Sequence, residues 1–159
     1  MKTEKEHLVA LLQEKKYHVS TAESCTGGLI AASIVDVSGA SNVFEEGYVT
    51  YSNAVKEKLL GVSADTIAKY TVVSSQVAEE MAVGMQERTG SELTISVTGY
   101  AGPGDAEDGT KAGTVYIGTC YLGRAVAKGF LFEGERRQVR EQAAEEAIRL
   151  GLERIENGE

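Results

Sequence analysis

Apolar residues recur every three to four positions in several stretches of the chain, which is the spacing of an amphipathic helix. In the clearest stretch, a capping serine at position 74 or 75 precedes one apolar face made of Val77, Ala78, Met81, Ala82 and Met85. Another stretch ends at Gly61, as helices commonly end at glycine. The spacing predicts helices over residues 3–16, 28–37, 53–60, 64–69, from 74 or 75 onward, and 135–156.

Between these helices, short runs rich in β-branched and aromatic residues predict strands. They cover residues 17–22, 47–51, 93–97, 113–121 and 125–132, and a tight Leu-Gly-Arg turn joins the last two. Strands that alternate with helices and end in one hairpin are typical of a three-layer α/β/α sandwich. We expect one domain over residues 1–159, built on a mixed, mostly parallel sheet of about five strands.

The predicted sheet also indicates where a functional site should lie. In open α/β sheets, ligands bind beyond the carboxyl ends of the strands. Three connections are expected to meet at that edge: residues 24–28, 51–56 and 98–113. We therefore expect the functional residues to lie in these three segments.

Charge and composition narrow the classes of function. The formal net charge of −8 disfavours nucleic acid as a partner, because phosphate backbones select basic surfaces. A small anionic ligand stays compatible, since a few amides or arginines suffice to hold it. No run approaches the roughly 18 apolar residues of a membrane span, and the charged first residues are not expected to be a signal peptide. Two distant cysteines favour a reduced, cytoplasmic setting over a disulfide framework.

Ser24 lies in a hydroxyl- and glycine-rich turn between a predicted strand and a predicted helix. Such a turn offers backbone amides and a helix N-terminus to an anion or a developing oxyanion. Ser24 is either a nucleophile or a helix cap, and capping is the commoner role of serine there. His18 is excluded as its base, because it lies on the same strand roughly 20 Å away, and His7 falls on the polar N-terminal helix. Lysine is the known alternative base.

Tyr51 and Lys56 form the second candidate pair. Tyr51 ends a predicted strand, and Lys56 follows about one turn into the next helix. A lysine desolvated in the cleft would have a lowered pKa and could accept the Ser24 proton, whereas the alternative is a surface lysine among other charged residues. Cys25 is the rival nucleophile, because a helix N-terminus lowers the pKa of a thiol. One of the two neighbours, Ser24 or Cys25, should point into the core.

The sequence contains no motif that is typical of a metal-dependent enzyme. No HExxH motif, CxxC motif or spaced histidine pair is present. Asp105, Glu107 and Asp108 lack the ligand spacing of a calcium loop, so we interpret them as part of a solvated acidic loop.

Two further features are candidates for ligand binding. The loop Thr98–Gly104 follows a strand and carries Gly99, Gly102 and Gly104, which suits either close backbone approach to a ligand or an ordinary long turn. Three arginines, Arg136, Arg137 and Arg140, open the last helix and oppose its dipole, which indicates either a phosphate or carboxylate contact or a solvated face.

Several motifs, taken in order, resemble the CinA C-terminal domain family. They are Ala22–Gly28, Phe44–Asn53 followed by Lys56, Leu60–Val62, Val73–Ser74, Ser96–Gly104 and Gly113–Tyr116. The resemblance covers essentially the whole chain, and the number and length of the motifs make it specific.

The resemblance implies a nicotinamide mononucleotide deamidase, which releases nicotinic acid mononucleotide and ammonia in bacterial pyridine-nucleotide salvage, with no metal or organic cofactor. It implies Ser24 rather than Cys25 as the nucleophile, Lys56 as the general base and Tyr51 as the third member. The turn residues Cys25, Thr26, Gly27 and Gly28 would bind substrate, with turn amides as anion or oxyanion donors. Arg136 and the loop with Thr98, Gly99, Gly102 and Gly104 are candidates for the ribose-phosphate end.

The chain departs from the family pattern after Gly104, where an acidic stretch replaces a glycine-rich one ending Lys-Pro-Val. Acidic residues there would weaken the binding of a phosphate, so this departure affects which substrate is expected. Two alternatives stay open: a non-catalytic nucleotide-binding or protein-interaction module of the same fold, and an amidase for another small carboxamide. A homodimer is one candidate assembly, through the helix with Leu8, Leu11 and Leu12 or through the final hairpin.

Overall fold

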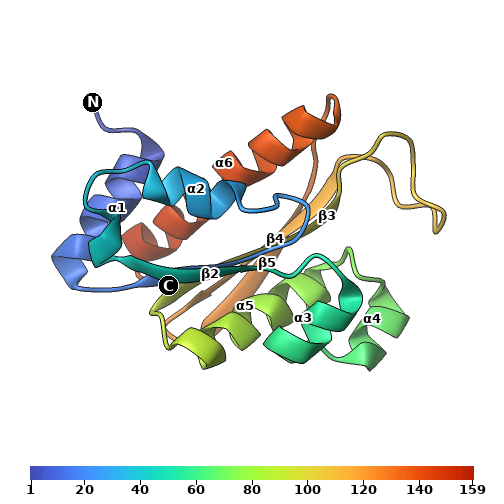
Figure 1. The fold of residues 1–159 in the computed structure, drawn as a ribbon, viewed down its shortest axis with the longest axis horizontal. Helices are drawn as coiled ribbons and strands as arrows, with labels where there is room; N and C mark the ends of the chain where they lie inside the picture. Colours follow the sequence, from blue (N-terminus) through green and yellow to red (C-terminus); the bar gives the residue numbers. More distant parts are fainter.

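The computed structural model describes residues 1–159 as a central sheet with helices on both faces (Figure 1). The predicted three-layer α/β/α arrangement is confirmed, and every predicted helix and strand is present. In chain order the elements are α1 (Glu4–Lys15), β1 (Val19–Glu23), α2 (Leu29–Val35), the 3-10 helix η1 (Ala40–Asn42), β2 (Phe44–Val49), α3 (Asn53–Leu60), α4 (Ala64–Tyr70), α5 (Ser75–Thr89), β3 (Leu93–Tyr100), β4 (Thr114–Tyr121), β5 (Arg124–Leu131) and α6 (Arg136–Asn157).

The sheet has five strands in the order β2-β1-β3-β4-β5. β1 lies parallel to its neighbours β2 and β3, whereas β4 runs antiparallel to β3 and β5. All strands except β4 therefore point the same way, as predicted for a mixed, mostly parallel sheet. The carboxyl ends of β1, β2 and β3 consequently meet at one edge.

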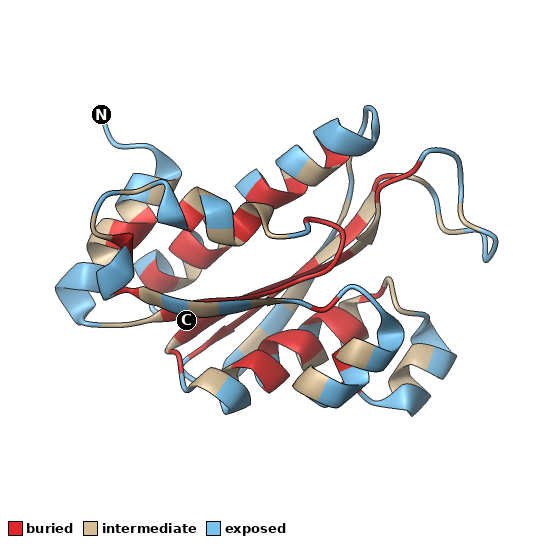
Figure 2. Ribbon diagram, viewed as in Figure 1, coloured by how far each residue is buried: buried red, intermediate tan, exposed pale blue.

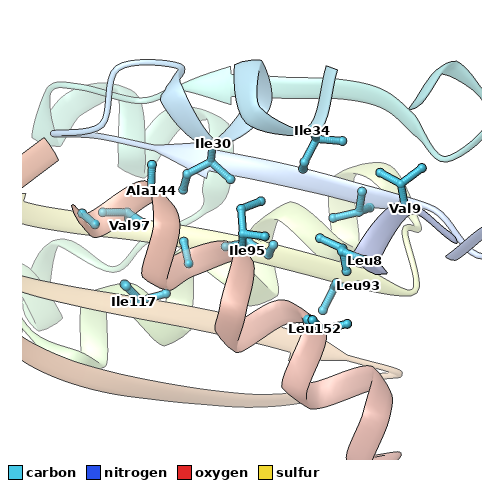
Figure 3. Close-up of a cluster of buried hydrophobic side chains, with 14 of the residues drawn as sticks. Leu8, Val9, Ile30, Ile34, Leu93, Ile95, Val97, Ile117, Ala144 and Leu152 are labelled. Carbon is cyan, nitrogen blue, oxygen red and sulfur yellow. The ribbon is translucent and has the colours of Figure 1, made fainter. Parts of the chain in front are cut away.

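The helices divide between the two faces of the sheet. Figure 1 shows α1, α2 and α6 on one face and α3, α4 and α5 on the other. In Figure 2 much of α5 is buried, whereas α4 has no buried residue. The larger core lies under α1, α2 and α6, where Ile30, Ile95 and Leu152 are among the side chains that meet (Figure 3). The smaller core contains Met81 and Met85 of α5. None of the helices is both long and apolar enough to cross a membrane.

The apolar side of α1 belongs to the larger core. Leu8 and Leu12 are fully buried against the rest of the chain, and α1 packs on α6. Leu8 and Leu12 are therefore not available to another subunit, whereas Leu11 is only partly buried and the homodimer stays a prediction.

Three hydroxyl side chains on β3 hold the opposite layer against the sheet. They donate to backbone carbonyls of α5 and of the segment before it: Thr94 to Ala82 at 2.7 Å, Ser96 to Ala78 at 2.6 Å and Thr98 to Val72 at 2.9 Å. These bonds satisfy polar groups buried in the central strand. The last of them anchors Val72 beside the carboxyl end of β3.

Four boundaries near that edge differ from the predicted ones. β1 ends at Glu23 instead of Ala22, and β3 ends at Tyr100 instead of Val97, so Thr98 and Gly99 belong to the strand and not to the loop. β2 ends at Val49 instead of Tyr51, because Ser52 caps α3 by accepting a hydrogen bond from the Val55 N–H at 3.2 Å. α2 begins at Leu29, because Gly28 is its N-cap with a φ of 106°, a conformation that favours glycine.

Candidate active site

The three predicted connections meet at the carboxyl edge of β1, β2 and β3, where they surround a pocket of about 200 Å³. The pocket is lined by Ser24, Cys25, Tyr51, Asn53, Lys56, Val72, Val73, Thr98, Gly99 and Tyr100. Six of the sequence-predicted site residues are therefore in one place: Ser24, Cys25, Tyr51, Lys56, Thr98 and Gly99.

The centre of the pocket is a contact between Ser24 and Lys56. Lys56 Nζ lies 3.0 Å from Ser24 Oγ, and it donates to the carbonyls of Thr50 at 2.8 Å and Tyr51 at 3.1 Å. A neutral lysine amine has two N–H donors and one lone pair. The two carbonyls match the two donors, so the lone pair is left for the Ser24 hydroxyl proton.

Burial prepares Lys56 for this role. Its side chain is the largest fully buried one in the chain, with a residue exposure of 1%. Desolvation lowers the pKa of Lys56 from its ordinary value near 10.5 to about 8, against a small opposing effect of Cys25. No carboxylate pairs with the amine, and two carbonyl dipoles replace a counter-ion. About a tenth of the amine is therefore neutral at pH 7, against well under 1% for an ordinary lysine.

Tyr51 is placed differently from the prediction. Its backbone carbonyl binds Lys56, but its phenol points outward and is bonded by Arg136 Nη2 at 3.2 Å. The residue is 60% exposed. The phenol of Tyr51 is thus a group at the pocket mouth, and the contact with the candidate base is made by its main chain.

The turn after Ser24 also differs from the predicted set of free amides. The Gly28 N–H donates to Glu23 Oε1 at 3.1 Å, and the Gly27 N–H donates to the Ser24 carbonyl at 3.0 Å. These two amides are therefore committed within the chain. The Cys25 N–H donates to no protein acceptor and Cys25 lines the pocket, so this is the turn amide that remains for a ligand oxygen. Thr26 is fully buried and does not line the pocket.

Arg140 of α6 holds this turn through hydrogen bonds to its backbone carbonyls, a role that the sequence analysis did not assign. Its guanidinium donates to the carbonyl of Cys25 at 2.9 Å and to that of Thr26 at 3.3 Å. Holding these carbonyls fixes the direction of the adjoining peptide groups. Gly27 adopts a φ of 57°, which favours glycine, and a Cβ there would lie 3.2 Å from Arg140 Nη2. The available signal was the spacing of Arg136 and Arg140, which puts them on one helix face.

Cys25 is in the pocket lining but has the properties of a core residue. It is 5% exposed and belongs to the larger hydrophobic core. Burial raises the pKa of the Cys25 thiol to about 11, despite the nearby Arg140 and Lys56. Its Sγ fills the space where a side chain on Gly99 would stand. The thiol is therefore protonated at neutral pH and poorly suited to attack.

The glycine-rich loop joins the site through Arg136. This arginine donates to the carbonyl of Gly102 as well as to Tyr51, which places the start of α6 at the pocket mouth. Thr98 lines the pocket, although its hydroxyl proton is directed to Val72. Gly104 adopts a φ of 66° with no atoms near its missing Cβ, so it shapes the loop without lining the pocket.

The acidic residues after Gly104 stabilise the turns of their own loop. Asp105 accepts from the Ala112 N–H at 3.1 Å, and Asp108 accepts from the Thr110 N–H at 2.9 Å. The loop projects from the body beyond β3 and β4 (Figure 1). The structure contains no group of three or more histidine, cysteine, aspartate or glutamate side chains that could hold a metal ion.

His18 lies away from the pocket, as the distance argument requires. Its ring nitrogens lie 3.7 Å from Glu45 and 3.9 Å from Glu92. Its backbone N–H donates to the carboxylate of Glu92 at 2.7 Å. Its position before β1 puts it at the opposite edge of the sheet from Ser24.

Comparison with known proteins places this geometry in context. The CinA C-terminal domain model matches residues 1–155. A nicotinamide-nucleotide amidohydrolase PncC of Enterobacter agglomerans is 45% identical over 144 residues, which are 90% of this chain and 88% of that protein. A competence-damage inducible protein of Limosilactobacillus fermentum is 49% identical over 145 residues, which are 90% of this chain and 35% of that protein. The chain thus spans about a third of the length of several relatives.

Solved structures agree over nearly the whole fold. A CinA-superfamily protein of Klebsiella pneumoniae superposes with a TM-score of 0.93 at 32% identity, covering 97% of this chain and 96% of that one. A competence/damage inducible protein of Agrobacterium tumefaciens gives a TM-score of 0.89 at 31% identity and 98% coverage of both chains. The chain belongs to the CinA C-terminal domain family.

Proposed function

We propose that this chain is an amidohydrolase that converts nicotinamide mononucleotide and water to nicotinic acid mononucleotide and ammonia, a step of pyridine-nucleotide salvage. The observation that carries the proposal is the contact of 3.0 Å between Ser24 Oγ and a buried Lys56 amine with no counter-ion. The name of the relative from E. agglomerans, which covers most of both chains, supports the substrate.

Acylation begins with the transfer of the Ser24 hydroxyl proton to neutral Lys56. Ser24 Oγ attacks the carboxamide carbon, and the carbonyl oxygen takes up the negative charge. The free N–H group of Cys25 is the proposed donor to this oxyanion, and one such donor is worth on the order of 3 kcal/mol. The Lys56 ammonium then protonates the departing nitrogen, the C–N bond breaks, and ammonia leaves.

Deacylation uses the same base. Lys56 is neutral again once ammonia has left, and it takes a proton from a water molecule that attacks the acyl carbon. The tetrahedral intermediate collapses with return of a proton to Ser24 Oγ, which releases the carboxylic acid. The carbonyls of Thr50 and Tyr51 stabilise the Lys56 ammonium in both half-reactions.

The mouth of the pocket is the proposed place of the ribose-phosphate end. Arg136 is the cation nearest the mouth through its contact with Tyr51, and Gly102 lies beside it. The exposed ring of Tyr51 offers an aromatic surface at the same place. Arg140 is less suited to a substrate anion, because its guanidinium is occupied by the turn carbonyls.

The test is ammonia release from a small panel of carboxamides: nicotinamide mononucleotide, nicotinamide riboside and nicotinamide. The proposal expects fastest turnover of the mononucleotide, with the acid product seen by chromatography, and no turnover by Ser24→Ala. Binding of the mononucleotide by calorimetry without acid product would instead identify a non-catalytic nucleotide-binding module. Faster turnover of another carboxamide would retain the amidase and replace the substrate.

A further inference from the structure

Glu23 is a buried carboxylate directly beside the candidate nucleophile. It ends β1, is 1% exposed and has no basic partner. Its Oε1 accepts from the N–H groups of Gly28 at 3.1 Å and Ile30 at 3.0 Å, and its Oε2 accepts from that of Ala31 at 3.0 Å. A buried charge is tolerated only with such compensation, so these amides hold the carboxylate firmly.

The first consequence concerns what can bind at the start of α2. A helix N-terminus attracts anions, but here the protein's own carboxylate occupies it. A substrate phosphate or an oxyanion is therefore excluded from the amides of Gly28, Ile30 and Ala31. The amide of Cys25 remains, directly after Ser24 in the pocket lining, where an oxyanion would form.

The second consequence concerns the base. The backbone carbonyl of Glu23 accepts from the Thr50 N–H at 2.7 Å. The carbonyl of that same Thr50 accepts from Lys56 Nζ at 2.8 Å. One residue thus fixes the turn that carries Ser24 through its side chain, and the strand end that holds Lys56 through its main chain.

We infer that Glu23 is a positioning residue for the hydrolytic reaction: its carboxylate sets the turn so that the Cys25 amide faces the oxyanion of a Ser24 attack. The inference rests on the proposed function. It goes further than helix capping, because a cap would affect only folding, whereas a positioning residue affects the rate of attack in the folded protein.

The test compares Glu23→Gln with the wild-type chain. Glutamine keeps the size and one acceptor oxygen, but it turns an NH₂ group toward an N–H donor and loses the charge. The inference expects kcat for nicotinamide mononucleotide to fall at least about tenfold with KM within about twofold, because attack geometry and oxyanion contacts act in the transition state. Glu92→Gln is the matched control, since Glu92 also accepts a backbone N–H but at the opposite edge of the sheet.

A second readout does not depend on the substrate. A fluorophosphonate probe phosphonylates an activated serine, forming an O–P bond as the P–F bond breaks and fluoride leaves, and it places its P=O oxygen in the oxyanion site. We expect its second-order rate of reaction with Ser24 to fall at least about tenfold in Glu23→Gln and to stay unchanged in Glu92→Gln. Circular dichroism at the assay temperature shows whether each variant is folded. If Glu23→Gln is unfolded there, Glu23→Asp replaces it, since its shorter carboxylate cannot reach all three amides, and the same slowing is expected.

The outcomes separate this inference from the proposed function. Slow labelling of a folded Glu23 variant, with no ammonia from nicotinamide mononucleotide in the wild type, would support the positioning role and overturn the substrate. Wild-type rates of labelling and turnover in a folded variant would overturn the positioning role and leave the amidase intact. A wild-type chain that neither hydrolyses the mononucleotide nor reacts with the probe would overturn both.

Discussion

The pH dependence of hydrolysis follows from the burial of Lys56. Its pKa is lowered to about 8 by desolvation, and only the neutral amine can accept the Ser24 proton. The neutral fraction is then about 9% at pH 7 and about 91% at pH 9. The value of kcat/KM should therefore rise about tenfold between these pH values, with its midpoint near 8.

Replacing the amine tests the same reasoning. Lys56→Arg puts a permanently charged guanidinium in place of the titrating amine, so no neutral base forms at any pH of the assay. We expect kcat/KM to fall by roughly 10²- to 10⁴-fold, and the rise through pH 8 to disappear. Lys58→Arg is the matched control, because Lys58 lies on the same helix but is exposed; it should keep the wild-type rate and profile.

The assay is initial-rate ammonia release between pH 6 and pH 9.5 at constant ionic strength, with circular dichroism at each pH. A flat profile for an active, folded wild-type chain would refute the assignment of Lys56 as a base that titrates near 8. A Lys56→Arg variant with wild-type activity would refute its participation altogether.

Three further predictions concern Tyr51, Arg140 and Gly84. Tyr51→Phe should raise KM a few-fold and leave kcat and its pH midpoint unchanged, because the phenol contacts the pocket mouth and not the base; a hundredfold fall in kcat would show a proton relay. Arg140→Ala should lower kcat about tenfold through loss of its two turn contacts, whereas exposed Arg137→Ala should not. Gly84→Ala should lower the free energy of unfolding in urea by about 2 kcal/mol, since its Cβ would stand 1.9 Å from the Leu60 carbonyl oxygen; unchanged stability would contradict this packing.

Periodicity and turn residues were sufficient to predict the layers of the fold, because those signals are local. Gly61 ends α3 in the left-handed conformation, and Ser74 caps α5 by accepting from the Val77 N–H at 3.2 Å. The meeting of Ser24 with Lys56 followed from topology, since parallel strands bring their carboxyl ends to one edge.

The direction of side chains within the site was not predictable in the same way. Glu23 directly follows the predicted strand 17–22 and proves to be the last residue of β1, and its bonds reach five to eight residues ahead toward α2. The missed signal is a charged residue within a strand buried along its whole length, which must find amide partners. Tyr51 was predicted to be the last residue of a strand. The strand ends at Val49 and Ser52 caps the next helix, so the backbone at Tyr51 is not that of a strand and the direction of its phenol could not be predicted.

The central claim is covalent attack by Ser24, and intact-protein mass spectrometry of rapidly quenched reactions tests it most directly. During turnover of nicotinamide mononucleotide, we predict an acyl adduct of the mass of the nicotinate mononucleotide moiety. Peptide mapping should place it on Ser24, with the adduct kept in Cys25→Ala and lost, together with ammonia release, in Ser24→Ala. Ammonia release by Ser24→Ala at the wild-type rate, or an adduct on Cys25, would contradict the account.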